Sequence, residues 1–222
     1  MTIHRMAGQT RGIYSGVVAR SSDRRSTLAL VLLALLAEEP MHPYRMQQMI
    51  KQRGKDKIAN VAARNSVYQT IDRLLRAELI TIRETSRDER RPERTVYELT
   101  DAGWDALRSW TRAMLAAPAR EYPEFPAALA SLMLLAPEDV HEQLSVRAAA
   151  LSAEVGQTRA ELADFPELPR LFRLDEEYLL AVREAELRWV AGVVDALRTG
   201  ELTWSEEWIR EIAEKLEGLG QT

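Results

Sequence analysis

The sequence predicts a mainly α-helical protein in two parts, a first domain of helices closed by a two-stranded hairpin and a second, all-helical domain. Three observations predict this. A segment with helical periodicity at 64–80 is followed at once by two segments of alternating apolar and polar residues, at 80–86 and 94–99. A proline-rich stretch, 118–126, then precedes residues that look helical throughout, 127–217. Helices followed by such a hairpin are typical of a winged helix-turn-helix domain.

Composition narrows the class of protein. A chain of 222 residues can form one or two domains with a real core. It has no Cys, which excludes disulfides, thiolate metal sites and Cys nucleophiles, and its three His (4, 42 and 141) lack metal-ligand spacing. The longest apolar stretch, 28–37, is too short to span a bilayer, and no signal peptide precedes it. We therefore expect a cytoplasmic protein with no cofactor, no metal and no membrane contact.

Charge is distributed unevenly along the chain. Residues 1–117 carry 20 Lys/Arg and 13 Asp/Glu, a net charge of +7, whereas residues 118–222 carry 10 and 21, a net charge of −11. The basic first part suggests contact with a polyanion and the acidic second part a different task. Two unrelated solvated surfaces are an equally good interpretation of charge alone.

The chain begins with residues 1–24, which we predict to be a flexible basic tail because they are rich in Gly and Ser and lack periodicity. Either the tail reaches a phosphate backbone as a disordered arm, or it is a flexible terminus that contacts nothing. The first domain, 25–117, opens with a helix to about Ala37, capped by Ser26 or Thr27 and apolar on nearly all sides.

Two prolines break this first helix, and a second helix is predicted from Tyr44 to about Gln52. The third helix, 64–80, places Val67, Ile71 and Leu74 on one face. The residues left to contact base edges or phosphates are Arg64, Asn65, Ser66, Tyr68, Gln69 and Arg73. An ordinary amphipathic helix with a polar outer face is the alternative.

The predicted hairpin has a basic tip between its strands. The eight residues 87–94 include Arg87, Arg90, Arg91 and Arg94, which suit a phosphate clamp or a minor-groove probe. Asp88, Glu89 and Glu93 dilute that charge, so a solvated turn remains an alternative. Thr100 then caps a fourth helix.

The second domain, 118–222, is predicted to be a helical dimerisation and effector domain behind a hinge at 118–126. A short helix at 127–135 precedes two long helices with narrow apolar seams, which suit an antiparallel pair. The seams either join two subunits or close the core of a single hairpin. The residues predicted for dimerisation are Leu144, Leu151, Val155, Leu174, Tyr178, Val182 and Trp189.

An enzyme is not expected, because the sequence shows no nucleotide-binding loop, metal cluster or Ser/His/Asp arrangement. A protein-interaction module is the alternative function, since winged helices also bind proteins. Basic residues on both the third helix and the hairpin favour DNA.

Three stretches, in the right order, resemble the PadR family of transcriptional regulators. L-A-L-V-L-L-A-L-L-A-E-E-P-M-H-P-Y resembles the first helix and the Pro-x-His-Gly-Tyr turn of the family. S-V-Y-Q-T-I-D-R-L-L-R-A-E-L-I resembles the recognition helix, and R-R-P-E-R-T-V-Y-E-L-T-D-A-G the wing and the entry to the next helix. The resemblance covers about 26–117, and the long helical remainder resembles the larger subfamily, in which that region dimerises. Pro43 and Glu78 depart from the pattern, because Gly is usual at both positions.

The resemblance implies a dimeric, ligand-responsive repressor that binds an inverted-repeat operator in double-stranded DNA. Ser66, Tyr68, Gln69 and Arg73 would then face the major groove, Tyr44 would contact or support the backbone, and Arg90, Arg91 and Arg94 would be wing contacts. By the same analogy a small aromatic effector could bind among Trp104, Trp110, Phe172, Tyr178 and Trp189. Aromatic residues at helical spacing are more often core residues, and that interpretation is kept beside it.

Overall fold

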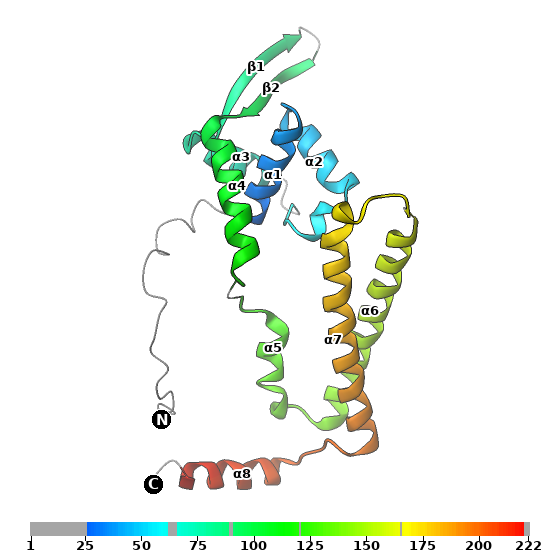
Figure 1. Cartoon of the computed structure of the whole chain (residues 1–222). Coiled ribbons are helices and arrows are strands. Elements are labelled where there is room, and N and C mark those ends of the chain that lie inside the picture. The colour runs from blue at the N-terminus through cyan, green and yellow to red at the C-terminus, as the bar shows by residue number, and fades with distance from the viewer. Residues whose placement is uncertain (1–25, 62–65, 89–90, 120, 165, 220–222) are drawn as a thin grey trace. The chain divides into compact units, whose positions relative to one another are not determined.

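The computed structural model describes residues 26–61, 66–88, 91–119, 121–164 and 166–219 (Figure 1). The chain divides into two compact units, Met1–Arg120 and Glu121–Thr222, called here the head and the base. The predicted tail, 1–24, lies outside the described residues. Between 85 and 94 only the backbone of the strands is described.

The head contains four helices, one 3₁₀ turn and one hairpin among its described residues. They are α1 (Thr27–Glu38), α2 (Pro43–Gln52), η1 (Lys55–Lys57), α3 (Ser66–Arg76), β1 (Ile80–Asp88), β2 (Arg91–Leu99) and α4 (Asp101–Ala116). The predicted winged-helix architecture and the Ser26 cap are confirmed, since the Ser26 hydroxyl accepts the Ala29 N–H at 3.1 Å.

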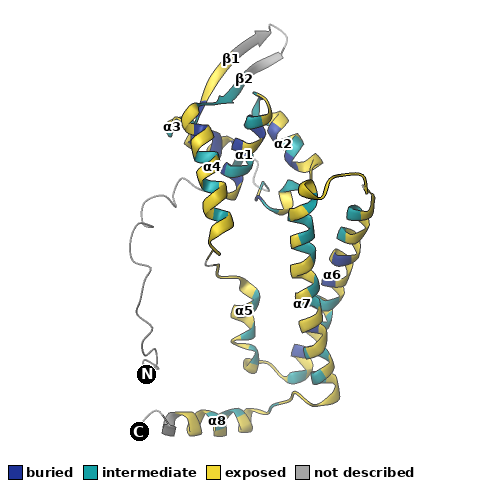
Figure 2. Cartoon of the chain, viewed as in Figure 1, coloured by how far each residue is buried: buried dark blue, intermediate teal, exposed yellow. Residues whose placement is uncertain are grey.

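The head core surrounds α1, along which Figure 2 shows buried residues. Leu32 and Leu33 of this helix are completely buried. Met46 and Ile50 from α2 and Ile71 from α3 pack in the same cluster. Burying each of these side chains contributes about 1.5–3 kcal/mol. The apolar character of α1 on nearly all sides is explained by this central position.

The hairpin is longer than the sequence predicts. The strands pair antiparallel from Ile80↔Leu99 to Asp88↔Arg91, so the predicted strands, 80–86 and 94–99, each gain residues from the predicted eight-residue tip. Backbone pairing needs no apolar side chains, so the alternating pattern marks only the part of the hairpin nearest the core. Met41 and Tyr97 also exchange two backbone hydrogen bonds of 3.1 Å, which tie the turn before α2 to β2.

The turn between α3 and β1 is the other difference from the predicted 64–80 helix. The helix ends at Arg76, and Glu78 adopts a left-handed backbone conformation with φ of 56°. The Leu79 N–H donates to the Leu74 carbonyl at 3.0 Å, which satisfies one of the last carbonyls of α3. Glu78 therefore occupies a position where glycine is favoured.

Glu78→Gly is expected to raise the free energy of unfolding by about 1 kcal/mol, because glycine adopts this conformation without steric cost. Urea denaturation followed by circular dichroism measures the change. Glu78→Ala is the control, since it removes the charge but keeps a Cβ at the strained position. Equal stability of the Gly and Ala variants would show that φ at this turn costs nothing.

The base is helical throughout its described residues. Its elements are α5 (Glu124–Leu129), η2 (Leu132–Leu134), α6 (Pro137–Asp164), η3 (Arg170–Arg173), α7 (Leu174–Thr199) and α8 (Glu206–Leu219). The long helices α6 and α7 run side by side in opposite directions (Figure 1). The short helix predicted at 127–135 instead begins at Glu124, with Pro126 in its first turn, where a missing N–H costs little.

The two long helices use their predicted seams differently. Val140, Leu144 and Leu151 of α6 are buried against α7, whose contribution comes from Val190 with Leu187, Val193, Val194 and Leu197. The α7 seam that periodicity picks out lies on another face, where Leu174, Tyr178, Val182 and Trp189 are 42–69% exposed. A hairpin core within one chain therefore forms, and the second apolar face of α7 stays largely exposed in the described chain.

Two negative findings apply to the described residues. None of their helices combines the length and the apolar character needed to cross a membrane. They also contain no cluster of His, Asp or Glu arranged to hold a metal ion.

Candidate nucleic-acid interface

The candidate interface begins with α3, which the head core holds by one face. Val67, Ile71 and Leu74 are buried, and so is the polar Thr70. Because the helix repeats every 3.6 residues, this leaves an outer polar face. The exposed residues of that face are Tyr68, Gln69, Asp72, Arg73 and Arg76. Three of the residues predicted to read DNA, Tyr68, Gln69 and Arg73, are therefore exposed, and Ser66 is half-buried in the first turn.

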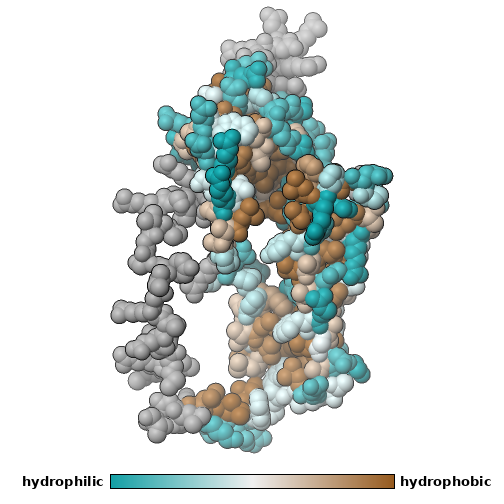
Figure 3. Space-filling view, in the orientation of Figure 1, coloured by the Kyte–Doolittle hydropathy of each residue, from teal (hydrophilic) through white to brown (hydrophobic). Residues whose placement is uncertain are grey.

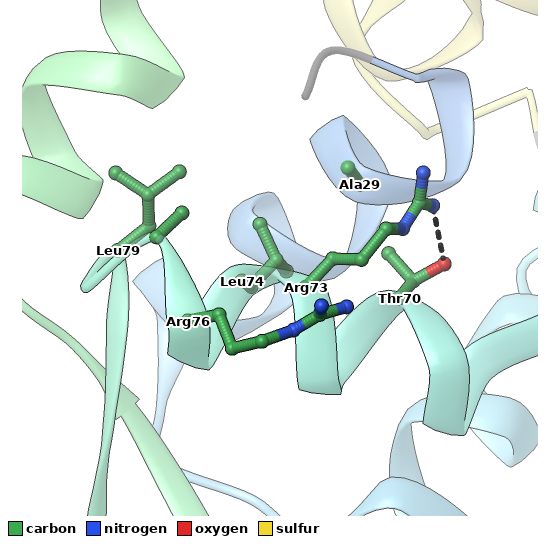
Figure 4. Close-up of a pocket in the computed structure, with 7 residues that line it drawn as sticks. Ala29, Thr70, Arg73, Leu74, Arg76 and Leu79 are labelled. Carbon is green, nitrogen blue, oxygen red and sulfur yellow. Dashed lines mark hydrogen bonds between the residues drawn. The ribbon is translucent and has the colours of Figure 1, made fainter. Parts of the chain in front are cut away.

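Thr70 orients Arg73 (Figure 4). The Thr70 hydroxyl donates to the Ser66 carbonyl at 2.8 Å and accepts from the Arg73 guanidinium, Nη2, at 3.1 Å. The buried hydroxyl thus holds the guanidinium beside the first turn of α3. Such a guanidinium keeps its remaining N–H donors for an acceptor outside the protein.

Arg76 extends back along the helix in the same direction (Figure 4), and its Nε donates to the Asp72 carbonyl at 3.3 Å. It was not among the residues assigned to DNA from the sequence. The spacing of Gln69, Arg73 and Arg76 at i, i+4 and i+7 could have revealed it, since these positions share one helix face.

Two surface depressions lie along this side of α3. One, of about 240 Å³, is lined by Ala29, Thr70, Arg73, Leu74, Arg76, Ala77 and Leu79. The other, of about 520 Å³, is lined by Leu28, Ser66, Gln69, Thr70, Asp72, Arg73 and Arg76. Both bring the two arginines next to the start of α1. The side of α3 toward α1 is therefore an uneven, basic surface.

The start of α2 presents Tyr44. His42 caps this helix, because its Nδ1 accepts the Arg45 N–H at 3.1 Å, and Pro43 occupies the first turn. Tyr44 is 61% exposed, stacks on His42 and accepts a hydrogen bond from Gln48 Nε2 at 3.4 Å. Pro43, a departure from the family pattern, thus begins a helix without disturbing the tyrosine.

The hairpin carries the predicted wing arginines along its far half. Arg87 lies on β1, and Arg91 and Arg94 lie on β2, where Arg94 is paired with Ser86. Arg90, at the tip, and Arg64 and Asn65, before α3, fall outside the described residues. Nearer the core Arg83 forms an ion pair of 3.8 Å with Glu98.

Tyr97 of β2 packs against the head core and lies near two residues of the outer face of α3. Burial of its phenol, followed by the nearby charges of Asp72 and Tyr68, raises the pKa of Tyr97. The phenol is therefore neutral at physiological pH. Tyr68 and Asp72 are therefore the exposed α3 residues whose charges act on Tyr97 of the wing.

The amino-acid sequence of the head matches a family model. The match, to the PadR-like family of transcriptional regulators, spans residues 32–109, from within α1 to within α4. The head of this chain therefore carries a PadR-like domain. That family is one of transcriptional regulators, which supports a DNA-binding regulator in that general sense.

Solved structures of PadR-family regulators share the fold. Bacillus subtilis PadR in complex with operator DNA superposes with a TM-score of 0.65 at 15% identity, covering 78% of this chain and 99% of that one. The same protein in complex with p-coumaric acid gives 0.63, with the same identity and coverage. The Vibrio cholerae virulence activator AphA gives 0.59 at 22% identity, covering 78% and 98%. A comparison with curated protein sequences found no significant match.

The predicted effector residues of this PadR-like chain fall in both units. Trp104 and Trp110 lie on α4 of the head, where Trp110 packs against the core and the Arg108 guanidinium lies 5.4 Å from the centre of the Trp104 ring. Phe172 lies on η3 of the base and is 62% exposed. Neither depression along α3 includes any of the three. The core interpretation therefore describes Trp110, whereas Phe172 is a surface residue in the described chain.

The predicted dimerisation residues separate into two groups. Leu144, Leu151 and Val155 are buried within one chain, on α6. The other four form the exposed stripe on α7: Leu174, Tyr178, Val182 and Trp189. Leu144 and Leu151 already pack in the core between α6 and α7 of the same chain, whereas the stripe on α7 is largely exposed.

Proposed function

We propose that this PadR-like protein is a homodimeric repressor that binds an inverted-repeat operator through two winged-helix heads. The observation that carries the proposal is the exposed face of α3, which carries Gln69, Arg73 and Arg76 and is followed in the chain by a hairpin with further arginines. The net charge of +7 over residues 1–117 supports contact with phosphates. The protein would act in the cytoplasm, with DNA as its main partner.

The stripe on α7 supports the dimer. Four large side chains, 42–69% exposed, recur along one face of a long helix, as at helix–helix interfaces. A two-fold dimer would use the same stripe twice. Two heads on such a base would bind two half-sites whose centres lie about 34 Å, or a multiple of that, apart.

Repression is proposed from the family resemblance, although one structure with the same fold is that of a virulence activator. A reporter gene placed behind the operator shows whether the protein represses or activates transcription. Repression predicts higher reporter output when the regulator is deleted. Lower output after deletion would make the protein an activator.

A small aromatic effector is proposed because a structural relative was solved with p-coumaric acid. Trp104, Trp110 and Phe172 are the candidate residues. A panel of phenolic acids should quench tryptophan fluorescence and release operator DNA. Tryptophan fluorescence and DNA binding that stay unchanged across the panel would contradict the proposal.

Fluorescence anisotropy against the DNA upstream of the gene tests the proposed function directly. It is measured at two salt concentrations with scrambled competitor DNA. We expect tight, competitor-resistant binding that weakens steeply with salt, because arginines would displace counterions from the phosphates. If every upstream fragment binds only weakly, and no more tightly than scrambled DNA, the protein-interaction alternative would be favoured.

Arg73→Ala is expected to weaken operator binding by about 1–3 kcal/mol and to relax base preference at one position of each half-site, because Arg73 would pair with a base edge. Arg76→Ala should instead weaken all sequences about equally, as loss of a phosphate contact does. Arg210→Ala, on α8 of the base, controls for net charge. Unchanged affinity and selectivity in Arg73→Ala would show that this residue does not contact the bases of the operator.

A further inference from the structure

The helix α5 is joined to the long helices of the base through one aromatic side chain, Phe125. The guanidinium carbon of Arg147, on α6, lies 3.6 Å from the centre of the Phe125 ring. The Trp189 ring, on α7, meets Phe125 edge-on, with ring centres 6.1 Å apart and planes at 81°. Apolar side chains gather in this region over α5 and the neighbouring part of the base (Figure 3).

Arg147 is itself held in place by an ion pair with α7. Its Nε donates to Glu186 at 2.9 Å, Nη2 bonds the same oxygen, and both side chains are partly buried. Glu186 also lies 3.5 Å from Arg183, which reaches Glu154 on α6 at 3.1 Å. These ion pairs set the plane of the guanidinium, so that it offers a flat, oriented surface to the Phe125 ring.

α5 depends on this contact. It has six residues and no side-chain cap at its N-terminus, and a helix that short does not persist alone in water. The next fixed points along the chain are Leu132, which packs against the base core, and the Leu135 carbonyl, which accepts the Trp204 indole N–H at 3.0 Å. Release of Phe125 would therefore free the chain as far as about residue 131.

We propose that Phe125 and Arg147 form a latch that sets the length of the connection between head and base, and so the half-site spacing that the dimer accepts. The proposal rests on the proposed function of two heads on one base. Latched, the connection comprises residues 117–123; released, it comprises 117–131. Its maximal reach then roughly doubles, from about 25 Å to about 50 Å.

A longer connection lowers the effective concentration of the second head at its half-site. The −3/2 power dependence on length predicts a fall of about three-fold. It also lets the head reach half-sites at other distances. Phe125 and Arg147 are thus positioning residues, which act on operator spacing without touching DNA.

The test compares Phe125→Ala and Arg147→Ala with Arg159→Ala in the full chain. Arg159 is the matched control, because it also joins α6 to α7, through a 2.7 Å ion pair with Glu184, about 18 Å along α6 from Arg147. Arg147→Lys keeps the charge and loses the flat guanidinium. The variants are measured first by hydrogen exchange of the α5 amides, and then by binding to operators with spacing altered by about half a turn and one turn of DNA.

We expect the two latch variants to lose amide protection in α5, and Arg147→Lys to lose part of it. Their affinity for the best-spaced operator should fall about three-fold or more, and their preference among spacings should shrink. Affinity for a single half-site should stay unchanged, and Arg159→Ala should behave as wild type. Retained protection in Phe125→Ala, or lost protection with an intact spacing preference, would overturn the latch.

The wild-type protein tests the underlying function separately. If it binds one half-site and two half-sites equally well, or ignores spacing, the dimeric function fails and the role of the latch in spacing fails with it. The exchange data are collected without DNA and report on the latch contact itself. They therefore distinguish a failed contact from a failed model of operator binding.

Discussion

Gly103→Ala is expected to lower the free energy of unfolding of the head by about 3 kcal/mol or more. A Cβ at this position would lie 2.0 Å from the Leu79 carbonyl oxygen and 3.0 Å from Leu99 Cδ2. The carbonyl belongs to the backbone of the turn that joins α3 to the wing, so it cannot move aside as a flexible side chain does. Overpacking of a tight contact costs about 1–3 kcal/mol, and a backbone clash lies at the upper end or beyond.

The close approach is held by hydrogen bonds that converge on Thr100. Its N–H donates to the Leu79 carbonyl at 3.2 Å, and its hydroxyl donates to the Glu78 carbonyl at 2.7 Å and accepts the Gly103 N–H at 3.0 Å. Thr100 therefore caps α4 and ties it to the end of α3. Displacing Leu79 in Gly103→Ala would disturb this cap and the start of the wing together.

Urea denaturation and hydrogen exchange in α1 and α3 measure the loss. Gly156→Ala is the control, because a Cβ there meets nothing within 4 Å and an interior helical Ala should stabilise by about 0.5–1 kcal/mol. If Gly103→Ala were as stable as Gly156→Ala, the contact between α4 and the turn would have to be loose.

Val182→Glu is expected to convert the proposed dimer to monomers. Val182 lies within the exposed stripe of α7, so a two-fold interface would bury two unpaired carboxylates. Their desolvation should weaken association by about 3 kcal/mol or more, over 100-fold in the dissociation constant. Light scattering across a concentration series measures the change, and operator affinity should fall toward that of one head.

Ala191→Glu is the matched control on the same helix, since Ala191 is exposed but lies outside the stripe. It should leave both the dimer and operator binding intact. If Val182→Glu dimerises as tightly as Ala191→Glu, the stripe is not the interface. If both variants are monomeric, the interface includes more of α7 than the stripe.

The amino-acid sequence determined the features that depend on neighbouring residues. Ser26 and Thr100 cap helices because a hydroxyl at that position satisfies a nearby N–H, and the prolines after α1 stop that helix by sterics alone. The buried side of α3 follows from helical spacing, so the outer positions of Tyr68, Gln69 and Arg73 were predictable. Each of these inferences needs only one or two turns of chain.

Tertiary structure decided what neighbouring residues leave open. α7 carries two apolar faces, and periodicity picked out the one with Tyr178 and Val182, whereas the core uses Val190. Both faces satisfy the same local rule, and only the packing of α6 chooses between them. The sequence likewise could not predict the length of the hairpin, the start of α5 or the position of the Arg147 guanidinium. These features depend on partners distant in sequence. Local chemistry can specify where an element begins and which residues line it, but the free energy that selects one face over another comes from contacts across the fold.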